Sequence, residues 1–272
     1  MSGSGKYALR FIALFYLLAL LLVPVAMILF HTFENGFTPV WESMKDPNAV
    51  AALKLSLKVA LIAVPLNTVF GIVFALMIVR SNIPGKAFLE ALLSIPFAVS
   101  PVIVGLTLIL VYGQDGWFGG WLQDHGYRVI FSTPGIVLAT IFVSLPFVAR
   151  EVIPVLREIG IEQEQAADTL GASARQTLWR VTLPAIRWGV IYGVVLTTAR
   201  AIGEYGAVAV VSGSVIGQSQ TLPLRVESEY QNFDHTGAYS AGLELALIAL
   251  FTLFVMNLIK PRKETTHGNR RV

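Results

Sequence analysis

Six long apolar stretches restrict the fold of this chain more than any other feature of its sequence. A helix needs about 20 predominantly apolar residues to cross the hydrocarbon core of a bilayer. The stretches are 11–30, 57–79, 92–112, 136–148, 188–211 and 241–259. The fourth reaches spanning length only with residues borrowed from 131–135 or from Ala149 onward. Only 14% of the residues are charged, against about 25% in soluble domains, so we predict an all-α polytopic membrane protein.

The first stretch follows Lys6 and Arg10, as the apolar core of a secretory signal peptide would. Its apolar run is longer than the usual core of about 7–15 residues. No small-x-small cleavage pattern follows Pro24. We therefore interpret this stretch as a retained transmembrane helix.

Most of the Lys and Arg residues fall on one side of the predicted spans. That side holds fourteen: Lys6, Arg10, Arg80, Lys86, Arg150, Arg157, Arg175, Arg180, Arg187, Lys260, Arg262, Lys263, Arg270 and Arg271. The other side holds five, namely Lys45, Lys54, Lys58, Arg128 and Arg225, and Arg200 lies inside the fifth span. Because cytoplasmic segments carry the excess of basic residues, both termini are predicted to be cytoplasmic. The net charge of +3 is then explained by topology, and we expect no nucleic-acid partner.

This orientation divides the chain into three parts. Residues 1–10 and 260–272 are predicted cytoplasmic tails, and residues 11–259 form a single transmembrane domain. The segment 150–187 is the longest one predicted outside the membrane, and it lies on the cytoplasmic side. The bilayer is therefore the first expected partner of the chain.

The cytoplasmic segment 150–187 has the pattern of two short helices. Acidic residues begin the first helix, where the helix dipole favours them, and Gly171 can end it in a left-handed turn. Ser173 is positioned to cap the second helix, and Pro184 is expected to break it before the fifth span. A helix lying on the membrane surface is the alternative, but such helices are usually rich in Lys and Arg.

The run from Gln165 to Gly171, QAADTLG, is followed by VTLP at 181–184. Together they resemble the EAA loop of ABC-importer permeases, whose pattern is E-A-A, three residues, G, nine residues, then I-x-L-P. Gln165 stands where the family has Glu, so it keeps the length of that side chain but not its charge. The resemblance implies a coupling helix that sits in a cleft of a cytoplasmic ATPase. The residues carried over to this ATPase-coupling loop are Gln165, Ala166, Ala167, Gly171, Leu183 and Pro184.

Four further motifs extend the resemblance along the chain from 57 to 259: IPFAVSPV at 95–102, SLPFV at 144–148, RAIGEYG at 200–206 and VVSGS at 210–214. They are similar to the sulfate/thiosulfate importer permeases, and most of all to their W-type subunit. The resemblance implies the type I ABC-importer permease fold in a bacterial inner membrane. It also implies four kinds of partner: a second, T-type permease, two ATPase subunits that bind ATP and Mg, and a periplasmic sulfate/thiosulfate-binding protein.

Arg200 and Glu204 stand four residues apart on the fifth predicted span. Residues at this spacing share a helix face and can neutralise each other. Ionisable residues within a span are costly and usually functional. Two interpretations stay open: a structural ion pair between helices, or a pair that lines or gates an anion pathway with Arg200 supplying the positive charge.

The third predicted span carries Pro96, Ser100 and Pro101. Proline removes a backbone donor and kinks a helix, and a broken helix can expose polar backbone to a cavity in the membrane. Ser100 and Pro101 are therefore candidate pathway residues, with a simple packing kink as the alternative. Gly189 and Gly193 form a small-xxx-small pair that predicts close helix packing.

The chain lacks the motifs of an enzyme. An ATP site needs G-x-x-x-x-G-K-[ST], which the segment Gly3–Tyr7 does not match. The four histidines, His31, His125, His235 and His267, are scattered and there is no cysteine, so no metal site and no cofactor are expected in this chain. Two alternative functions stay open: a permease for molybdate or another oxyanion, and a proton-coupled secondary transporter that uses Glu204.

Overall fold

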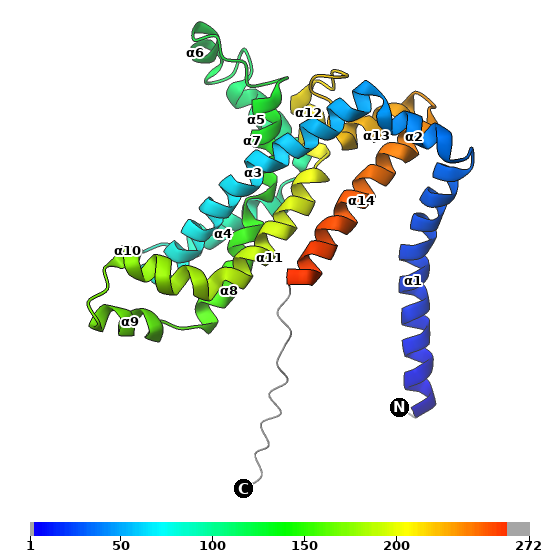
Figure 1. The fold of residues 1–272 in the computed structure, drawn as a ribbon. Helices are drawn as coiled ribbons and strands as arrows, with labels where there is room; N and C mark the ends of the chain where they lie inside the picture. The colour runs from blue at the N-terminus through cyan, green and yellow to red at the C-terminus, as the bar shows by residue number, and fades with distance from the viewer. Residues whose placement is uncertain (1–2, 260–272) are drawn as a thin grey trace.

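The computed structural model describes residues 3–259, whose regular elements are all helices (Figure 1). The predicted cytoplasmic tail 260–272, with His267, lies outside the described residues. The helices are α1 (Gly3–Phe33), α2 (Phe37–Lys45), α3 (Pro47–Arg80), α4 (Lys86–Ala98), α5 (Pro101–Tyr112), α6 (Gly119–Asp124), α7 (Thr133–Ser144), α8 (Pro146–Glu158), α9 (Glu162–Thr169), α10 (Ala174–Thr177), η1 (Leu178–Thr182), α11 (Leu183–Ile202), α12 (Gly206–Ser212), α13 (Leu222–Gln231) and α14 (His235–Ile259).

Five helical segments of the described chain are long and apolar enough to cross a membrane, and there are six when a bent pair of helices is counted as one broken span. They are Leu9–Phe33, Pro47–Arg80, Thr133–Glu158, Ala174–Ile202 and His235–Val255, with the pair Lys86–Ala98 and Pro101–Tyr112. The predicted all-α polytopic fold is confirmed.

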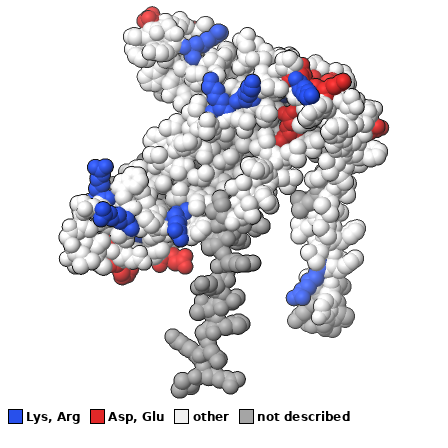
Figure 2. Space-filling model, in the orientation of Figure 1, with Lys and Arg blue, Asp and Glu red and all other residues white. Residues whose placement is uncertain are grey.

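Different helices lie at the two ends of the molecule (Figure 1). The first residues of α1 and the last residues of α14 lie at the same end as α9 and α10, opposite α2, α6 and α13. Figure 2 shows charged side chains gathered at the two ends, with a mostly uncharged belt between them on the visible face. This arrangement fits a bilayer around the belt and both ends of the described chain on the α9 side.

The second span is longer than its apolar core. The Asp46 side chain accepts hydrogen bonds from two amides of the first turn of α3, at 3.1 and 3.2 Å, and proline follows as the first helical residue. Since a capped helix starts there, α3 begins ten residues before the predicted 57–79. Lys54, which the predicted span left outside, therefore lies in the outer part of α3 together with Lys58.

The third span is two helices instead of one kinked helix. α4 and α5 meet at an angle of 106°. Ser100, between them, has an extended backbone with ψ of 134°, because a residue that precedes proline is pushed out of the helical region. Pro101 then occupies the first turn of α5, where its missing amide hydrogen costs nothing.

The fourth span extends in both directions from 136–148. Helix α7 begins at Thr133, and α8 continues to Glu158. Arg150 and Arg157 therefore belong to the cytoplasmic end of a helix, and the segment outside the spans is shorter than the predicted 150–187.

Pro184 does not break the chain, and the prediction that it ends the second loop helix is wrong. One helical run continues from Ala174 to Ile202, with the π-helical turn η1 immediately before α11. A π turn changes the hydrogen-bond register, so Pro184 falls at the start of a new register, where its lack of an amide hydrogen is tolerated.

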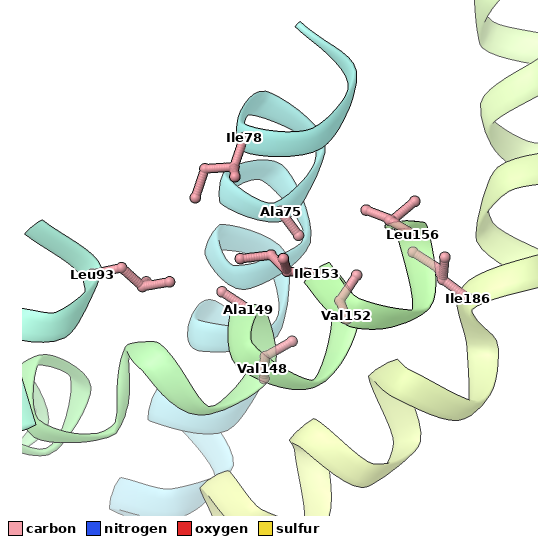
Figure 3. Close-up of a cluster of buried hydrophobic side chains, with 9 residues drawn as sticks. All are labelled: Ala75, Ile78, Leu93, Val148, Ala149, Val152, Ile153, Leu156 and Ile186. Carbon is pink, nitrogen blue, oxygen red and sulfur yellow. The ribbon is translucent and has the colours of Figure 1, made fainter. Parts of the chain in front are cut away.

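The core at the α9 end is built around α8, which packs against α3 and α11 (Figure 3). Its buried side chains are Ala75 and Ile78 from α3, Leu93 from α4, Val148, Ala149, Val152, Ile153 and Leu156 from α8, and Ile186 from α11. Gly71 and Gly193 both face Val148: a Cβ on Gly71 would lie 2.6 Å from Val148 Cβ, and one on Gly193 would lie 2.7 Å from Val148 Cα. The predicted packing role of Gly193 is thus confirmed.

Candidate functional site

The predicted coupling segment forms the separate helix α9, which projects at one end of the molecule (Figure 1). Within this fully described helix no residue is buried. Gln165 and Ala166 are exposed and Ala167 is half-buried, while Leu170, just after the helix, is 88% exposed. An exposed helix with small side chains leaves room for another protein to approach.

The turn after α9 has the predicted chemistry. Gly171 adopts φ of +82°, and its amide donates to the Asp168 carbonyl at 2.9 Å. The Ala172 amide donates to the Ala167 carbonyl at 3.0 Å. This pair of bonds is the Schellman motif, which requires a left-handed residue and favours glycine.

Ser173 caps the following helix, as predicted. Its hydroxyl accepts from the Gln176 amide at 3.4 Å, and its own amide donates to Gln176 Oε1 at 2.8 Å. This reciprocal arrangement is a capping box. The short loop 170–173 therefore has a defined geometry.

The last two residues of the predicted loop set sit at the start of α11. Leu183 packs against the buried cluster around α8. Pro184 is exposed and lines a cleft of about 570 Å³ together with Arg180, Arg187 and Trp188. Leu183 thus connects the loop to the core by packing, whereas Pro184 lies on the surface of the molecule.

Glu164 makes the contacts that hold α9 to the rest of the chain. Its Oε2 lies 2.9 Å from Arg80 Nε, at the end of α3, although the two atoms are not aligned for a hydrogen bond. Its Oε1 accepts a hydrogen bond from Thr182 Oγ1 of η1 at 2.8 Å. Arg80 also donates to the Gly160 carbonyl at 2.5 Å. Sequence reasoning missed this cluster. Its only signal in the sequence is Arg80, a cation at the end of α3.

Arg200 and Glu204 do form an ion pair, with Arg200 Nη1 2.6 Å from Glu204 Oε2, though the two are not aligned for a hydrogen bond. They do not share a helix face, because α11 ends at Ile202 and Glu204 lies in the break before α12. Its Oε1 accepts from the Ala207 amide at 2.9 Å. The start of α12 favours a carboxylate, since the first turn of a helix has unpaired amides.

The break after Ile202 lies against the break after Ala98. Helix α12 packs on α5, and a Cβ on Gly206 would lie 3.0 Å from Pro101 Cβ. A Cβ on Gly105 would meet Val210 at 2.7 Å. Ser100 is exposed at the start of α5 and its hydroxyl makes no cap. The structure therefore brings the two predicted pathway segments together at one place.

Two acidic positions have other roles. Glu90 of α4 pairs with Arg157 of α8 at 2.6 Å in an exposed contact. Asp46, besides capping α3, pairs with the buried Arg225 at 3.1 Å.

Among residues 3–259, no three His, Asp or Glu side chains gather closely enough to hold a metal ion.

The sequence matches the family model of the binding-protein-dependent transport system inner membrane component over residues 67–265. The chain belongs to this family, the multi-pass inner-membrane permeases of ABC importers. In such importers the ATPase is a separate subunit. This membership favours the ATP-driven transporter over the proton-coupled alternative.

Several relatives are similar over almost their whole length. The chain is 51% identical to the sulfate transport system permease protein CysW of Synechocystis sp., covering 94% of this chain and 93% of that one. It is 48% identical to the protein of the same name from Escherichia coli, covering 96% and 89%. It is 37% identical to the sulfate transport system permease protein CysT of Synechococcus elongatus, covering 90% and 88%.

Solved structures share the fold at low sequence identity. A bacterial alginate ABC transporter, in complex with its periplasmic protein bound to alginate pentasaccharide, matches with a TM-score of 0.77 at 19% identity. The match covers 94% of each chain. It supports the helical arrangement and says nothing about the substrate.

Proposed function

We propose that this chain is one of two permease subunits of an ATP-driven importer for sulfate or thiosulfate. The observation that carries the proposal is the identity of about half of all residues to the CysW permeases over nearly the whole chain. The similar but more distant CysT relative supports a T-type permease as the second subunit. Two ATPase subunits, which bind ATP and Mg, and a periplasmic sulfate/thiosulfate-binding protein complete the proposed complex.

In the proposed mechanism the ATPases act on the exposed face of α9. Gln165, Ala166 and Ala167 would meet the ATPase, and Gly171 would fix the end of the helix. Closure of the ATPases would move α9 and, through Leu183, the start of α11. Access would then alternate between the two sides of the membrane.

The pathway is proposed to pass the two helix breaks. Arg200 would supply positive charge for a dianion, and Glu204 would keep that guanidinium in place, since the carboxylate is itself fixed by the Ala207 amide. From the facing break, Ser100 would contribute its hydroxyl, and Pro101 would start α5 there, where amides of the first helical turn have no partner within the helix. A dianion would then meet a cation whose counter-charge is buried.

Uptake by the reconstituted complex tests the substrate. Proteoliposomes that hold this chain, the T-type permease and the ATPases, with the binding protein on the outer face, should take up labelled sulfate. Excess thiosulfate should compete more strongly than molybdate. Uptake of labelled molybdate but not of sulfate would overturn the substrate assignment and leave the permease assignment intact.

A further inference from the structure

The helix α9 is held to the rest of the chain mainly by polar contacts. None of its residues is buried, so apolar packing cannot fix its orientation. It contacts the neighbouring α10 and η1, and its path from α8 turns at Gly160, which has φ of +66°. A helix in this position needs other contacts if its movement is to reach the membrane spans.

Arg80 and Glu164 supply these contacts. The side chains are 16% and 20% exposed, so solvent screens their attraction less than that of a surface pair. The one guanidinium reaches Glu164 on α9 and the Gly160 carbonyl at the turn that leads into α9. The middle of the link between α8 and α9 and the first turn of α9 are thereby held by the last residue of α3.

The second oxygen of Glu164 connects α9 to the other span. It accepts from Thr182, a buried residue in the π turn, and this turn continues directly into α11. One carboxylate therefore bridges the cytoplasmic ends of α3 and α11. Beyond them, α11 ends beside the Arg200–Glu204 pair, and α3 is fixed at its outer end through Asp46 and Arg225.

We propose that Arg80 and Glu164 are positioning residues that couple movement of α9 to α3 and α11. This inference rests on the proposed function, because it takes α9 as the site where the ATPase acts. Glu164 contacts Arg80 of the same chain, while its neighbour Gln165 is exposed. The acidic residue beside the EAA-like motif therefore makes a contact within the permease and not with the ATPase. Loss of either residue should leave ATP hydrolysis intact and disconnect it from transport.

The first test measures sulfate transported per ATP hydrolysed in the complete complex. Arg80→Ala and Glu164→Ala should each lower this ratio about fivefold or more, the range of ordinary coupling between sites. The double variant should lose less than the product of the two single losses, because the two residues share one contact, while each also has a bond of its own, to Gly160 and from Thr182. Arg80→Lys should recover part of the ratio. Arg157→Ala, which removes the exposed pair with Glu90, is the matched control and should keep the wild-type ratio.

Three results would overturn the proposal. One is a wild-type ratio in the single variants, and another is a double variant whose loss is the product of the two single losses. The third is loss of the complex from the membrane in Arg80→Ala and Arg80→Lys alike, which would make the pair a general folding contact.

A second test does not depend on the substrate. The chain has no cysteine, so, with partner subunits from which cysteines have been removed, spin labels at Val69→Cys on α3 and Asp168→Cys on α9 report one distance in the complete complex. The distance distribution should be narrow with Arg80 present and broad in Arg80→Ala, and an unchanged distribution would overturn the proposal. If the wild-type complex takes up no sulfate, the proposed function fails, while this distance still decides whether the pair positions α9.

Discussion

The Glu204 carboxylate is buried between two helix ends and lies 2.6 Å from the Arg200 guanidinium. The Glu204 side chain is 1% exposed and the Arg200 side chain 32% exposed, so the carboxylate is buried while the guanidinium is partly exposed. The carboxylate also accepts a hydrogen bond from the Ala207 amide in the first turn of α12. The pair is therefore asymmetric: its positive member is the one that can meet a solute.

Arg200→Ala should lower sulfate uptake and leave the complex assembled. Without Arg200, the buried Glu204 carboxylate keeps only the Ala207 amide as a partner, which costs more than the ~1–3 kcal/mol of a neutral group left unsatisfied. Uptake and co-purification of the subunits measure the two effects. Wild-type uptake in Arg200→Ala would remove the pathway role, and loss of assembly would assign the pair to structure alone.

Substitution of Gly171 tests whether the end of α9 matters for coupling. A Cβ at this position would meet nothing within 4 Å, so the effect comes only from the backbone, where φ is +82°. The left-handed region costs L-residues about 1–2 kcal/mol, and asparagine tolerates it best. Uptake should fall in the order wild type, Gly171→Asn, Gly171→Val, with the protein still in the membrane. Equal uptake by all three would contradict the coupling role of this turn.

Gly193→Ala should destabilise the complex. Its Cβ would lie 2.7 Å from the Val148 backbone, which is too close, so α11 must move away from α8. Overpacking of this kind costs about 1–3 kcal/mol. The melting temperature of the solubilised complex should therefore drop.

Gly242→Ala is the control for that measurement. It introduces the same methyl group on α14, where nothing lies within 4 Å. Alanine is also a better helix former than glycine, so the melting temperature should not fall. Equal destabilisation by both substitutions would show that the close approach of α11 to α8 is unimportant.

Ser100→Cys should react with a charged, membrane-impermeant thiol reagent. Ser100 is exposed at the break between α4 and α5, and the absence of native cysteine makes labelling of this chain specific. Leu61→Cys is the matched control, since Leu61 is 77% exposed on the apolar surface of α3 and should face lipid. Equal labelling at the two positions would contradict a water-filled pathway beside Ser100.

Local signals in the sequence were sufficient where a few neighbouring residues decide the structure. Apolar length identified the spans because every backbone group in the bilayer must be bonded within its own helix. Gly171 and Ser173 were predicted correctly because the turn and the cap depend on bonds over three to five residues. These features needed no knowledge of the rest of the fold.

Contacts between distant segments could not be predicted in the same way. Arg80 and Gly160 are 80 residues apart along the chain, and nothing near either one indicates the other. The spacing of Arg200 and Glu204 predicted the ion pair correctly, but it predicted one continuous helix, whereas α11 ends at Ile202 and α12 packs on α5. Thr182 and Leu183, at the π turn before Pro184, likewise contact distant segments, namely Glu164 of α9 and the cluster around α8.

The energy source of uptake tests the central claim most directly. Proteoliposomes that hold the complete complex would receive labelled sulfate and the binding protein on one side and ATP with Mg on the α9 side. The account predicts that sulfate accumulates with ATP, and that neither a non-hydrolysable ATP analogue nor a proton gradient supports accumulation. Accumulation driven by the proton gradient in the absence of ATP would contradict it.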